Sequence, residues 1–196
     1  MALPASDNFN RSPGDVGANW TDVIGGWDVG ASNNATPSIF GYNSSYWSAD
    51  AFAADHYAQA LIVQLSDGGP SCRVLSGPAR SYHFDAKAGA GNSKLQKDVN
   101  GSFTDLLTGL TAVNGDVLYI EAVGTTIKVK VNGVQVGTDA TDSAIATGAC
   151  GMWSWDTGTN MDDFLADNIG GGAAPTVNKP GRVELERPFN MVRGRR

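Results

Sequence analysis

Hydrophobic and polar side chains alternate with a period of two through residues 126–136. Such alternation is typical of a β-strand that has one buried and one solvated face. The dipeptide at 132–133, Asn-Gly, interrupts the pattern, and both residue types tolerate the positive φ angles of a type I′ turn. The segment therefore predicts a tight hairpin in a sheet that packs on a second layer. The predicted cross-strand pairs are Val131 with Val134, Val129 with Val136 and Ile127 with Thr138.

Most of the remaining chain repeats this two-residue period in short runs that end at Gly, Asn or Asp. Few segments keep the 3.6-residue spacing of an amphipathic helix, and residues 35–50 are predicted to form an aromatic-rich loop. This profile is typical of an all-β protein and predicts a two-sheet antiparallel jelly-roll sandwich. The other predicted strands lie in residues 6–11, 17–30, 56–69, 71–77, 80–86, 93–99, 102–110, 115–124, 142–155 and 160–172.

The chain divides into an acidic jelly-roll body, residues 1–172, and a basic end, residues 173–196. The body carries 8 basic and 18 acidic residues, a net charge of −10, and it is large enough for one domain with one core. A surface of this sign argues against binding to the phosphate backbone, so no nucleic acid partner is expected. No apolar run approaches the roughly 20 residues of a membrane-spanning helix, so no membrane partner is expected either.

The basic end carries 6 basic and 2 acidic residues, three prolines and little alternation outside residues 182–187. It is predicted to be an extended C-terminal arm that docks on a neighbouring subunit or adds a strand to its sheet edge. The opposite charges of arm and body would assist docking, and the alternatives are an arm folded on its own body or a cloning remnant. The predicted assembly residues are Arg182, Val183, Leu185, Arg187, Phe189, Arg193, Arg195 and Arg196.

Several motifs follow one another in a recognisable order. "DNFNR" stands near the start, "GDVLYIEAVGTTIKVKVNGVQV" forms a meander, and "DDFLADNI" closes the body. Over residues 5–170 these motifs resemble the concanavalin A-like lectin/glucanase superfamily, in its LamG-like and laminarinase-like branches. The resemblance implies a jelly roll whose first and last strands are neighbours. The superfamily includes lectins, adhesion modules, glycan hydrolases and structural domains of phages, so the fold alone does not choose a function.

The hydrolase branch of this superfamily carries an E-x-D-x-(x)-E pattern on one strand, which places its carboxylates on the same face. That pattern is absent from the body, whose single glutamate, Glu121, has no carboxylate partner two or four residues away. Asp162 and Asp163 are adjacent, so a strand would direct them to opposite faces. No nucleophile motif accompanies the two histidines. The protein is therefore expected not to be an enzyme.

Exposed aromatic rings beside amides and carboxylates would bind a sugar by stacking and by hydrogen bonds to its hydroxyl groups. Residues 42–50 gather such groups in one predicted loop. Trp153 and Trp155 share one face of a predicted strand, so they are expected to share one environment, which we predict to be the core between the sheets. The candidate glycan-binding residues are Tyr42, Asn43, Tyr46, Trp47 and Asp50.

The sequence offers few candidates for a metal site or a disulfide. The family resemblance implies a structural Ca²⁺ beside the first and last strands, where Asp7 and Asp163 stand, but such a site needs about six oxygen ligands. Strand-end capping and solvated charge are the alternative interpretation. Cys72 and Cys150 allow either one disulfide or two buried free thiols. With two histidines and no zinc-ligand spacing, a zinc site is not expected.

These observations lead to one expected function and two alternatives. The expected function is a non-catalytic structural component of a large assembly, in particular a phage virion, as a capsid decoration or fibre-associated protein. Its arm would bind neighbouring subunits, and its exposed loops would contact surface glycans. Residues 1–10 lack the features of a secretory leader, which favours assembly in the host cytoplasm. The alternatives are a secreted, extracellular carbohydrate-binding module and a glycan hydrolase.

Overall fold

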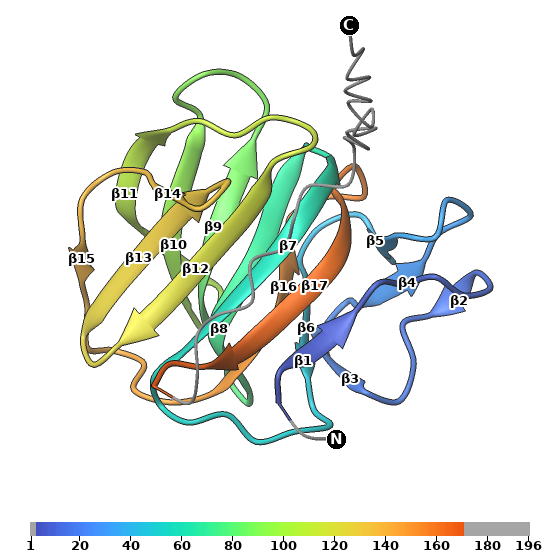
Figure 1. Cartoon of the computed structure of the whole chain (residues 1–196), viewed down its shortest axis with the longest axis horizontal. Helices are drawn as coiled ribbons and strands as arrows, with labels where there is room; N and C mark the ends of the chain where they lie inside the picture. Colours follow the sequence, from blue (N-terminus) through green and yellow to red (C-terminus); the bar gives the residue numbers. More distant parts are fainter. Residues whose placement is uncertain (1–2, 171–196) are drawn as a thin grey trace, which may run out of the picture.

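The structure, a computed structural model, describes residues 3–170, which form a sandwich of a ten-stranded and a seven-stranded antiparallel sheet (Figure 1). The predicted fold class, an all-β two-sheet jelly roll, is therefore confirmed. This part of the chain contains no helix, and hence none long and apolar enough to cross a membrane. The predicted arm, residues 173–196, and the boundary predicted at residue 172 lie outside the described residues.

The ten-stranded sheet is built around β7 (His56–Gln64), which pairs on one side with β12 (Val117–Val123) and on the other with β17 (Asn160–Asn168). The short β1 (Ala5–Asp7) also pairs with β17, which confirms that the first and last strands are neighbours. The other strands are β2 (Gly14–Asp15), β4 (Trp27–Val29), β5 (Ala35–Pro37), β13 (Thr126–Val131), β14 (Val134–Gln135) and β15 (Ala140–Thr141). The order is β14-β13-β12-β7-β17-β5-β4-β2, with β15 on β13.

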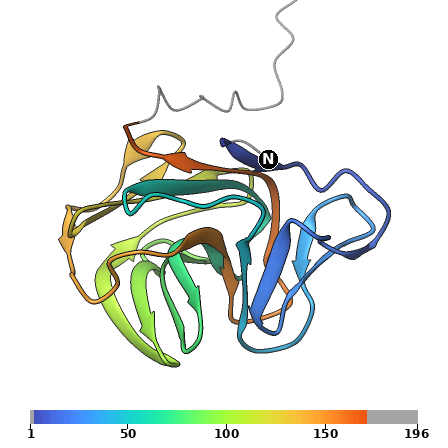
Figure 2. The ribbon, with the colours of Figure 1, turned by 90° about the horizontal axis from the view of Figure 1, so that it is seen from below.

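The seven-stranded sheet lies beneath the larger one as a second layer (Figure 2). Its strands are β3 (Trp20–Ile24), β6 (Asn43–Trp47), β8 (Asp67–Ser76), β9 (Ala79–Lys87), β10 (Ser93–Val99), β11 (Ser102–Leu110) and β16 (Ala149–Ser154). The order is β11-β10-β9-β8-β16-β6-β3, so the strands from β8 to β11 follow one another as antiparallel neighbours. The sequence pattern predicts β9, β10 and β11 to within one residue at each end, but it assigns residues 67–69 to the preceding strand, whereas β8 begins at Asp67.

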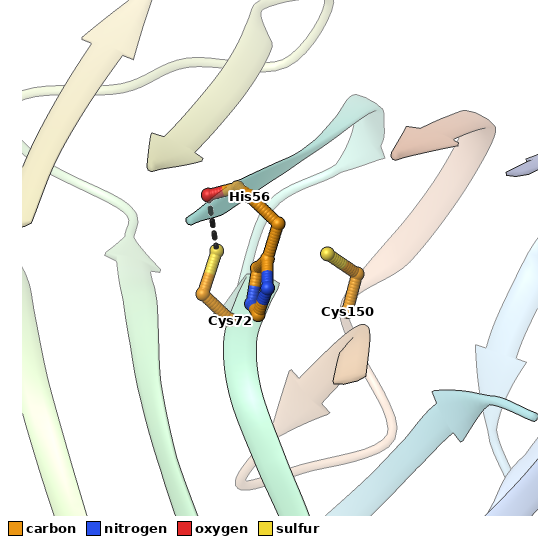
Figure 3. A group of neighbouring side chains, drawn as sticks. All are labelled: His56, Cys72 and Cys150. Atoms are coloured by element: carbon orange, nitrogen blue, oxygen red, sulfur yellow. Dashed lines mark hydrogen bonds between the residues drawn. The ribbon is translucent and has the colours of Figure 1, made fainter. Parts of the chain in front are cut away.

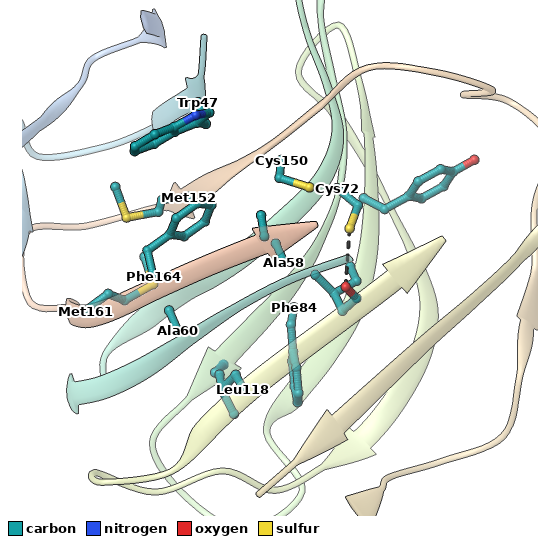
Figure 4. Close-up of a cluster of buried hydrophobic side chains, with 14 of the residues drawn as sticks. Trp47, Ala58, Ala60, Cys72, Phe84, Leu118, Cys150, Met152, Met161 and Phe164 are labelled. Carbon is teal, nitrogen blue, oxygen red and sulfur yellow. Dashed lines mark hydrogen bonds between the residues drawn. The ribbon is translucent and has the colours of Figure 1, made fainter. Parts of the chain in front are cut away.

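The core lies between the sheets and is built from alternate residues of the facing strands (Figure 4). Phe84 of β9 and Leu118 of β12 are both fully buried in it. Trp47 stacks on Phe164 of β17 with ring centroids 6.4 Å apart, and Trp20 meets these two rings edge-on at 5.4 and 4.7 Å. Each such pair adds roughly 0.5–1.5 kcal/mol beyond the burial of its area. This aromatic group therefore ties β3 and β6 of one sheet to β17 of the other.

The predicted hairpin forms between β13 and β14. Its turn residues, 132–133, have φ angles of 51° and 80°, as a type I′ turn requires. Val131 pairs with Val134, and the amide of Val136 donates a hydrogen bond to the carbonyl oxygen of Val129 (3.1 Å). The turn and the first two predicted pairs are therefore confirmed.

The predicted register is wrong beyond that point. Ile127 pairs with Ala140 rather than with Thr138, because the chain leaves the sheet after β14 and returns as β15. The buried face of the hairpin is correspondingly short. Ile127 and Val129 are fully buried, whereas the side chain of Val134 is 68% exposed.

The prediction of a loop through residues 35–50 is also wrong. Residues 43–47 form β6, which lies between β16 and β3, and residues 35–37 form β5. The sequence pattern does not predict β6 because the run Asn-Ser-Ser at 43–45 breaks the alternation of apolar and polar residues. All three of these polar side chains are nevertheless buried.

Candidate functional site

The seven-stranded sheet has one face that is turned away from the core, which we call its outer face. β9 shows how the sequence produces this face. Tyr82, Phe84 and Ala86 belong to the core, so the alternate side chains of the strand point the other way. These outward side chains are Ser81, His83, Asp85 and Lys87. They place titratable groups side by side on a sheet face.

Four aromatic rings gather on the outer face, from Tyr42, Phe103, Trp153 and Trp155. Tyr42 stacks on Trp155 with ring centroids 6.2 Å apart and planes at 28°, and Phe103 of β11 meets Trp155 edge-on at 5.6 Å. Trp153 of β16 is buried, whereas Trp155 is 45% exposed. This aromatic cluster therefore presents a solvent-facing indole on a base of packed rings.

The imidazole of His83 supports the cluster from β9. Its ring stacks on that of Trp153 with centroids 4.0 Å apart and planes at 14°. β8 runs between the two strands, where Gly69 pairs with Trp153 and Ser71 pairs with His83. Burial lowers the pKa of His83 to about 3, so the ring is neutral at physiological pH.

A chain of hydrogen bonds fixes the polar side chains next to this stack. Gln96 donates through Nε2 to Asp105 (2.6 Å), so its Oε1 lies toward Nε2 of His83 (3.3 Å) and accepts from it. The other ring nitrogen, Nδ1, then accepts from the hydroxyl of Ser81 (3.2 Å). Asp105 also accepts from Nζ of Lys94 (2.8 Å). The bond from Gln96, followed by that from Lys94, lowers the pKa of Asp105 and keeps it ionised.

Two carboxyl groups, those of Asp67 and Asp85, converge beside the cluster from the adjacent strands β8 and β9. Both contact the ammonium group of Lys87, whose Nζ lies 3.2 Å from Oδ2 of Asp67 and 3.4 Å from Oδ2 of Asp85. Asp85 is fully buried, and among residues 3–170 no hydrogen-bond donor serves either of its oxygens or Oδ1 of Asp67. Burial, reinforced by Asp67, raises the pKa of Asp85 to about 8, so Asp85 holds a proton at neutral pH.

A hollow of about 300 Å³ opens between the aromatic cluster and this acid–lysine group. We call it the aromatic hollow. Ring faces suit the C–H faces of a sugar, and the polar groups suit its hydroxyl groups. The aromatic hollow is lined by Asp67, Asp85, Lys87, Gln96, Phe103, Trp153 and Trp155.

The structure brings one predicted glycan-binding residue, Tyr42, into the aromatic cluster. Its hydroxyl group donates a hydrogen bond to Asp98 of β10. Tyr46 is half-buried on β6, where it pairs with Gly151 of β16 two residues from Trp153. Both tyrosines therefore lie on strands or strand ends next to the site.

The structure places three other predicted glycan-binding residues in supporting positions. Trp47 is buried in the core, so the expectation that it is exposed is wrong. Asp50 accepts a hydrogen bond from the indole N–H of Trp47 (3.0 Å) and so fixes the orientation of that ring. Asn43 is also fully buried, and its amide donates to the carbonyl oxygens of Ile39 and Gly41 (both 2.8 Å). Asn43 thus shapes the chain that leads to Tyr42.

The expectation that Trp153 and Trp155 share one environment in the core is wrong. Trp153 does lie within β16, but on the outer face, where His83 buries it. β16 ends at Ser154, so Trp155 follows the strand, and the alternation of side chains along the strand does not set the direction of its ring. The aromatic hollow therefore has one buried indole, that of Trp153, and one exposed indole, that of Trp155.

The predicted Ca²⁺ residues line a second hollow, of about 440 Å³, on the other sheet. Asp7 uses both carboxylate oxygens within the protein: Oδ1 accepts from the amide of Phe9 (2.9 Å) and from Arg11 (2.7 Å), and Oδ2 accepts from Arg11 (2.9 Å) and from the indole of Trp20 (2.9 Å). Each oxygen therefore already serves two donors, which fits the strand-end alternative. Asp163 lies at a register shift of β17, with a φ of 47°.

Both cysteines are buried free thiols and lie near His56 (Figure 3). The ligand atoms of His56, Cys72 and Cys150 lie within 4.8 Å of one another. His56, however, accepts from the amide of Arg73 at Nε2 (3.0 Å), so its Nδ1 carries the proton and donates to the carbonyl oxygen of Ala53 (2.7 Å). With both nitrogens in use, this group is explained by core packing rather than by a metal.

Sequence reasoning missed the polar residues of the aromatic hollow. The alternation through residues 79–87 does predict that Asp85 and Lys87 share a face with His83. It gives no sign that Asp67 of another strand lies beside them. It also gives no sign that this face, rather than the outer face of the larger sheet, holds the aromatic cluster.

Comparison with known sequences finds no matching family model and no matching curated protein. Comparison with solved structures finds sandwiches of the predicted kind. Carbohydrate-binding module CBM66 from Bacillus subtilis is 22% identical over 76% of this chain and 92% of its own, with a TM-score of 0.54. A β-1,3-1,4-glucanase (lichenase) derived from a mouse hindgut metagenome is 11% identical over 86% of this chain and 100% of its own, with a TM-score of 0.59.

A third similar structure is the exoplasmic/lumenal domain of VIP36 in its Ca²⁺/Man2-bound form. It is 10% identical over 80% of this chain and 82% of its own, with a TM-score of 0.53. At these identities the likeness concerns the fold. It supports the predicted jelly-roll sandwich, and these neighbours are a carbohydrate-binding module, a glucanase and a Man2-bound domain.

Proposed function

We propose that this domain binds carbohydrate in the aromatic hollow. The observation that carries the proposal is the composition of the hollow, which is lined by the exposed indole of Trp155 together with the carboxyl groups of Asp67 and Asp85. A sugar ring has an apolar face and a polar rim, and this hollow offers a partner to each. The similar structures named above include proteins that bind or cleave glycans, which supports the same class of ligand.

The proposed role is binding without catalysis. The acid and the nucleophile of a retaining glycosidase stand about 5–5.5 Å apart, on either side of the bond that is cleaved. Asp67 and Asp85 instead contact one ammonium group, that of Lys87, and the proton on Asp85 relieves their repulsion. This arrangement favours a polar recognition group over a separated catalytic pair. Release of reducing ends from a panel of β-glucans and fructans would contradict the non-catalytic role, above all if Asp85→Ala abolished it.

A structural role in a phage virion, which the sequence favoured, draws no support from the similar structures. It depended on the arm, residues 173–196, and that arm lies outside the described residues. Glycan contact, a secondary part of that expectation, is supported instead by the aromatic hollow, which the sequence did not reveal.

The experiment is a screen on a glycan array, followed by calorimetric titration of the best oligosaccharide. We expect binding, and we expect Trp155→Ala to weaken it by about tenfold, which corresponds to about 1.4 kcal/mol. The matched control is Tyr119→Ala, which removes a half-buried aromatic ring from the outer face of the other sheet. No binding by the parent protein, or equal binding by Trp155→Ala, would overturn the proposal.

A further inference from the structure

A second exposed aromatic ring, that of Phe40, lies near the aromatic hollow and has no part in the proposed function. Phe40 is 83% exposed, more than any other large hydrophobic residue among residues 3–170. It stands two residues before Tyr42, whose ring stacks on Trp155. Single exposed apolar residues are common on protein surfaces, so a role for Phe40 must be argued from how the chain holds it and from what lies beside it.

The loop that carries Phe40, residues 38–42, is fixed by a buried amide. Asn43 is fully buried at the start of β6. Its Oδ1 accepts from the amide of Ile39 (3.2 Å), and its Nδ2 donates to the carbonyl oxygens of Ile39 and Gly41 (both 2.8 Å). These bonds hold the residues on either side of Phe40. A ligand that contacts the ring therefore meets a loop that is already ordered, which lowers the entropic cost of binding.

A glycine supports the same loop from the connection between β3 and β4. Gly25 has a φ of 61°, and a β-carbon at this position would lie 2.7 Å from the carbonyl oxygen of Tyr42 and 3.0 Å from the side chain of Ile39. The amide of Ser38 donates to the carbonyl oxygen of Gly26 (2.9 Å). The loop thus packs directly on the backbone of this connection, where a larger residue does not fit. Two separate features of the sequence therefore maintain the loop.

The pairing of β6 with β16 places this loop beside Trp155. Asn43 pairs with Ser154, the last residue of β16, so Tyr42 and Trp155 leave the sheet at the same end, where their rings stack. Two residues of extended chain span at most about 7 Å, so the α-carbon of Phe40 lies within that distance of the α-carbon of Tyr42. The exposed rings of Phe40 and Trp155 are therefore both close to Tyr42 at one end of the smaller sheet.

We propose that Phe40 is a second stacking site for carbohydrate, which binds a sugar residue of the same chain beyond the one in the aromatic hollow. The inference rests on the proposed function and deepens it by naming the class of ligand, an oligosaccharide of several residues rather than a single sugar. The ring of Phe40 offers an apolar face and no polar group, so its contact is with the C–H face of a sugar.

The size of the aromatic hollow supports an extended ligand. Its volume, about 300 Å³, stands at the lower end of the range of small-molecule sites, which is roughly 300–1,000 Å³. A chain of several sugars therefore extends outside it. On the side of Trp155 and Tyr42, the loop at residues 38–42 is the next surface that such a chain meets, and Phe40 is its exposed ring.

The test is a series of oligosaccharides of one linkage, from disaccharide to hexasaccharide, based on the glycan that binds best on the array and titrated calorimetrically. We expect the affinity of the parent protein to rise with length and then level off, because only longer chains reach Phe40. Phe40→Ala should weaken binding of the longest chain by about fivefold, the worth of one aromatic contact, and leave the shortest unchanged. Trp155→Ala should weaken binding at every length.

Three results would overturn the second stacking site. The affinity of the parent protein is independent of chain length, or Phe40→Ala binds every length as the parent does, or Phe40→Ala weakens all lengths by the same factor. A fourth concerns another occupant of the exposed ring. If light scattering finds the parent to be a dimer and Phe40→Ala to be a monomer, Phe40 belongs to an interface between copies and the proposal is wrong.

Two further variants show whether the contact is stacking. Phe40→Tyr keeps a flat ring and should retain the dependence on length. Phe40→Leu keeps apolar bulk without a flat face and should lose most of it, and full affinity in this variant would contradict stacking. The matched control is Val134→Ala, which shortens another strongly exposed apolar residue, in the hairpin of the larger sheet, and should bind every length as the parent does.

The outcomes also separate this inference from the proposed function. If the parent protein binds a glycan and Trp155→Ala weakens binding, but Phe40→Ala matches the parent at every length, carbohydrate binding in the hollow stands and the second stacking site is wrong. If no glycan on the array binds, both are wrong. The unfolding transition of each variant is measured, so that a loss of binding is read only from folded protein.

Discussion

The hydroxyl group of Tyr42 donates a hydrogen bond to the carboxylate of Asp98 on the outer face of the seven-stranded sheet. Asp98 is fully buried and accepts a second bond from the amide of Gly101 (2.8 Å). Burial raises the pKa of Asp98, and it also raises the pKa of Tyr42, more strongly still. Tyr42 is therefore held at its hydroxyl group by β10 and at its ring by Trp155. It links the segment that leads into β6 with β10 and with Trp155.

Tyr42→Phe is expected to destabilise the fold while it preserves most of the ligand affinity. The ring remains beside Trp155, but one oxygen of the buried Asp98 loses its donor, which costs about 1–3 kcal/mol. The measurement is the free energy of unfolding in urea, together with a titration of the glycan that the parent protein binds. Tyr46→Phe, on the adjacent strand, is the control and should change the unfolding free energy by less than about 0.5 kcal/mol. Equal stability of the two variants would argue against the bond.

His83 is expected to remain neutral in the folded protein at every pH between 5 and 8. Its pKa is lowered from 6.5 to about 3 by burial, so the unfolded chain takes up a proton that the folded protein refuses. The free energy of unfolding is therefore unaffected by His83 above pH 6.5. As the pH falls from 6.5 toward 3, protonation of this residue in the unfolded chain lowers the free energy of unfolding by up to about 1.4 kcal/mol per pH unit. A proton NMR titration of the ring checks this. A midpoint for His83 between pH 6 and 7 would show that its stack on Trp153 is open to water.

Part of the smaller sheet could be predicted because turn residues separate its strands along the chain. The segments predicted at 93–99 and 102–110 are the observed β10 and β11, with the Asn-Gly turn at 100–101 between them. β6 escaped prediction because Asn43 and its two neighbouring serines are polar yet buried. Alternation reports burial only where buried residues are apolar, so a strand that buries amides and hydroxyl groups gives no signal.

The aromatic hollow was less predictable than the fold because it depends on pairing between strands. The spacing of His83 and Asp85 places them on one face, but the approach of Asp67 depends on the register of β8 against β9, which pairs Asp67 with Lys87. That register includes a shift between residues 72 and 75. A period of two within one strand carries no information about such a shift, so the convergence of the two carboxyl groups emerges only in three dimensions.

The two cysteines are expected to stay unmodified in the native protein. Both are fully buried, and their thiols donate to backbone carbonyl oxygens, Cys72 to Ile120 (3.3 Å) and Cys150 to Tyr57 (3.2 Å). Burial raises the pKa of Cys150 well above its usual range, so this residue carries little reactive thiolate. Burial also opposes ionisation of Cys72, but its interactions with Cys150 and His56 lower its pKa to about 6, so the protection of Cys72 rests on its complete burial. Iodoacetamide labelling followed by mass spectrometry should find no adduct without denaturant and two adducts in concentrated urea. A native mass two hydrogens lower would reveal a disulfide and contradict the free-thiol state.

The parent protein is expected to become less stable as the pH rises because Asp85 must lose its proton. The Asp85→Asn variant is expected not to show this decrease. The folded protein holds the proton of Asp85 up to a pKa of about 8, whereas the unfolded chain releases it near 3.8. The stabilisation linked to this proton is therefore complete below pH 3.8 and is lost as the pH rises through 8, by up to about 1.4 kcal/mol per unit. An asparagine keeps the shape of the side chain and does not titrate.

The measurement is the free energy of unfolding of parent and variant at pH 5, 7 and 9. The gap between them should widen in favour of Asp85→Asn as the pH rises, because only the parent must bury a second negative charge beside Asp67. Asp105→Asn is the control, since the pKa of Asp105 is lowered by its bonds to Gln96 and Lys94 and that variant should be less stable than the parent at all three pH values. Parallel curves for the parent and Asp85→Asn would mean that Asp85 is ionised throughout, and that Lys87 rather than a proton balances the two carboxylates.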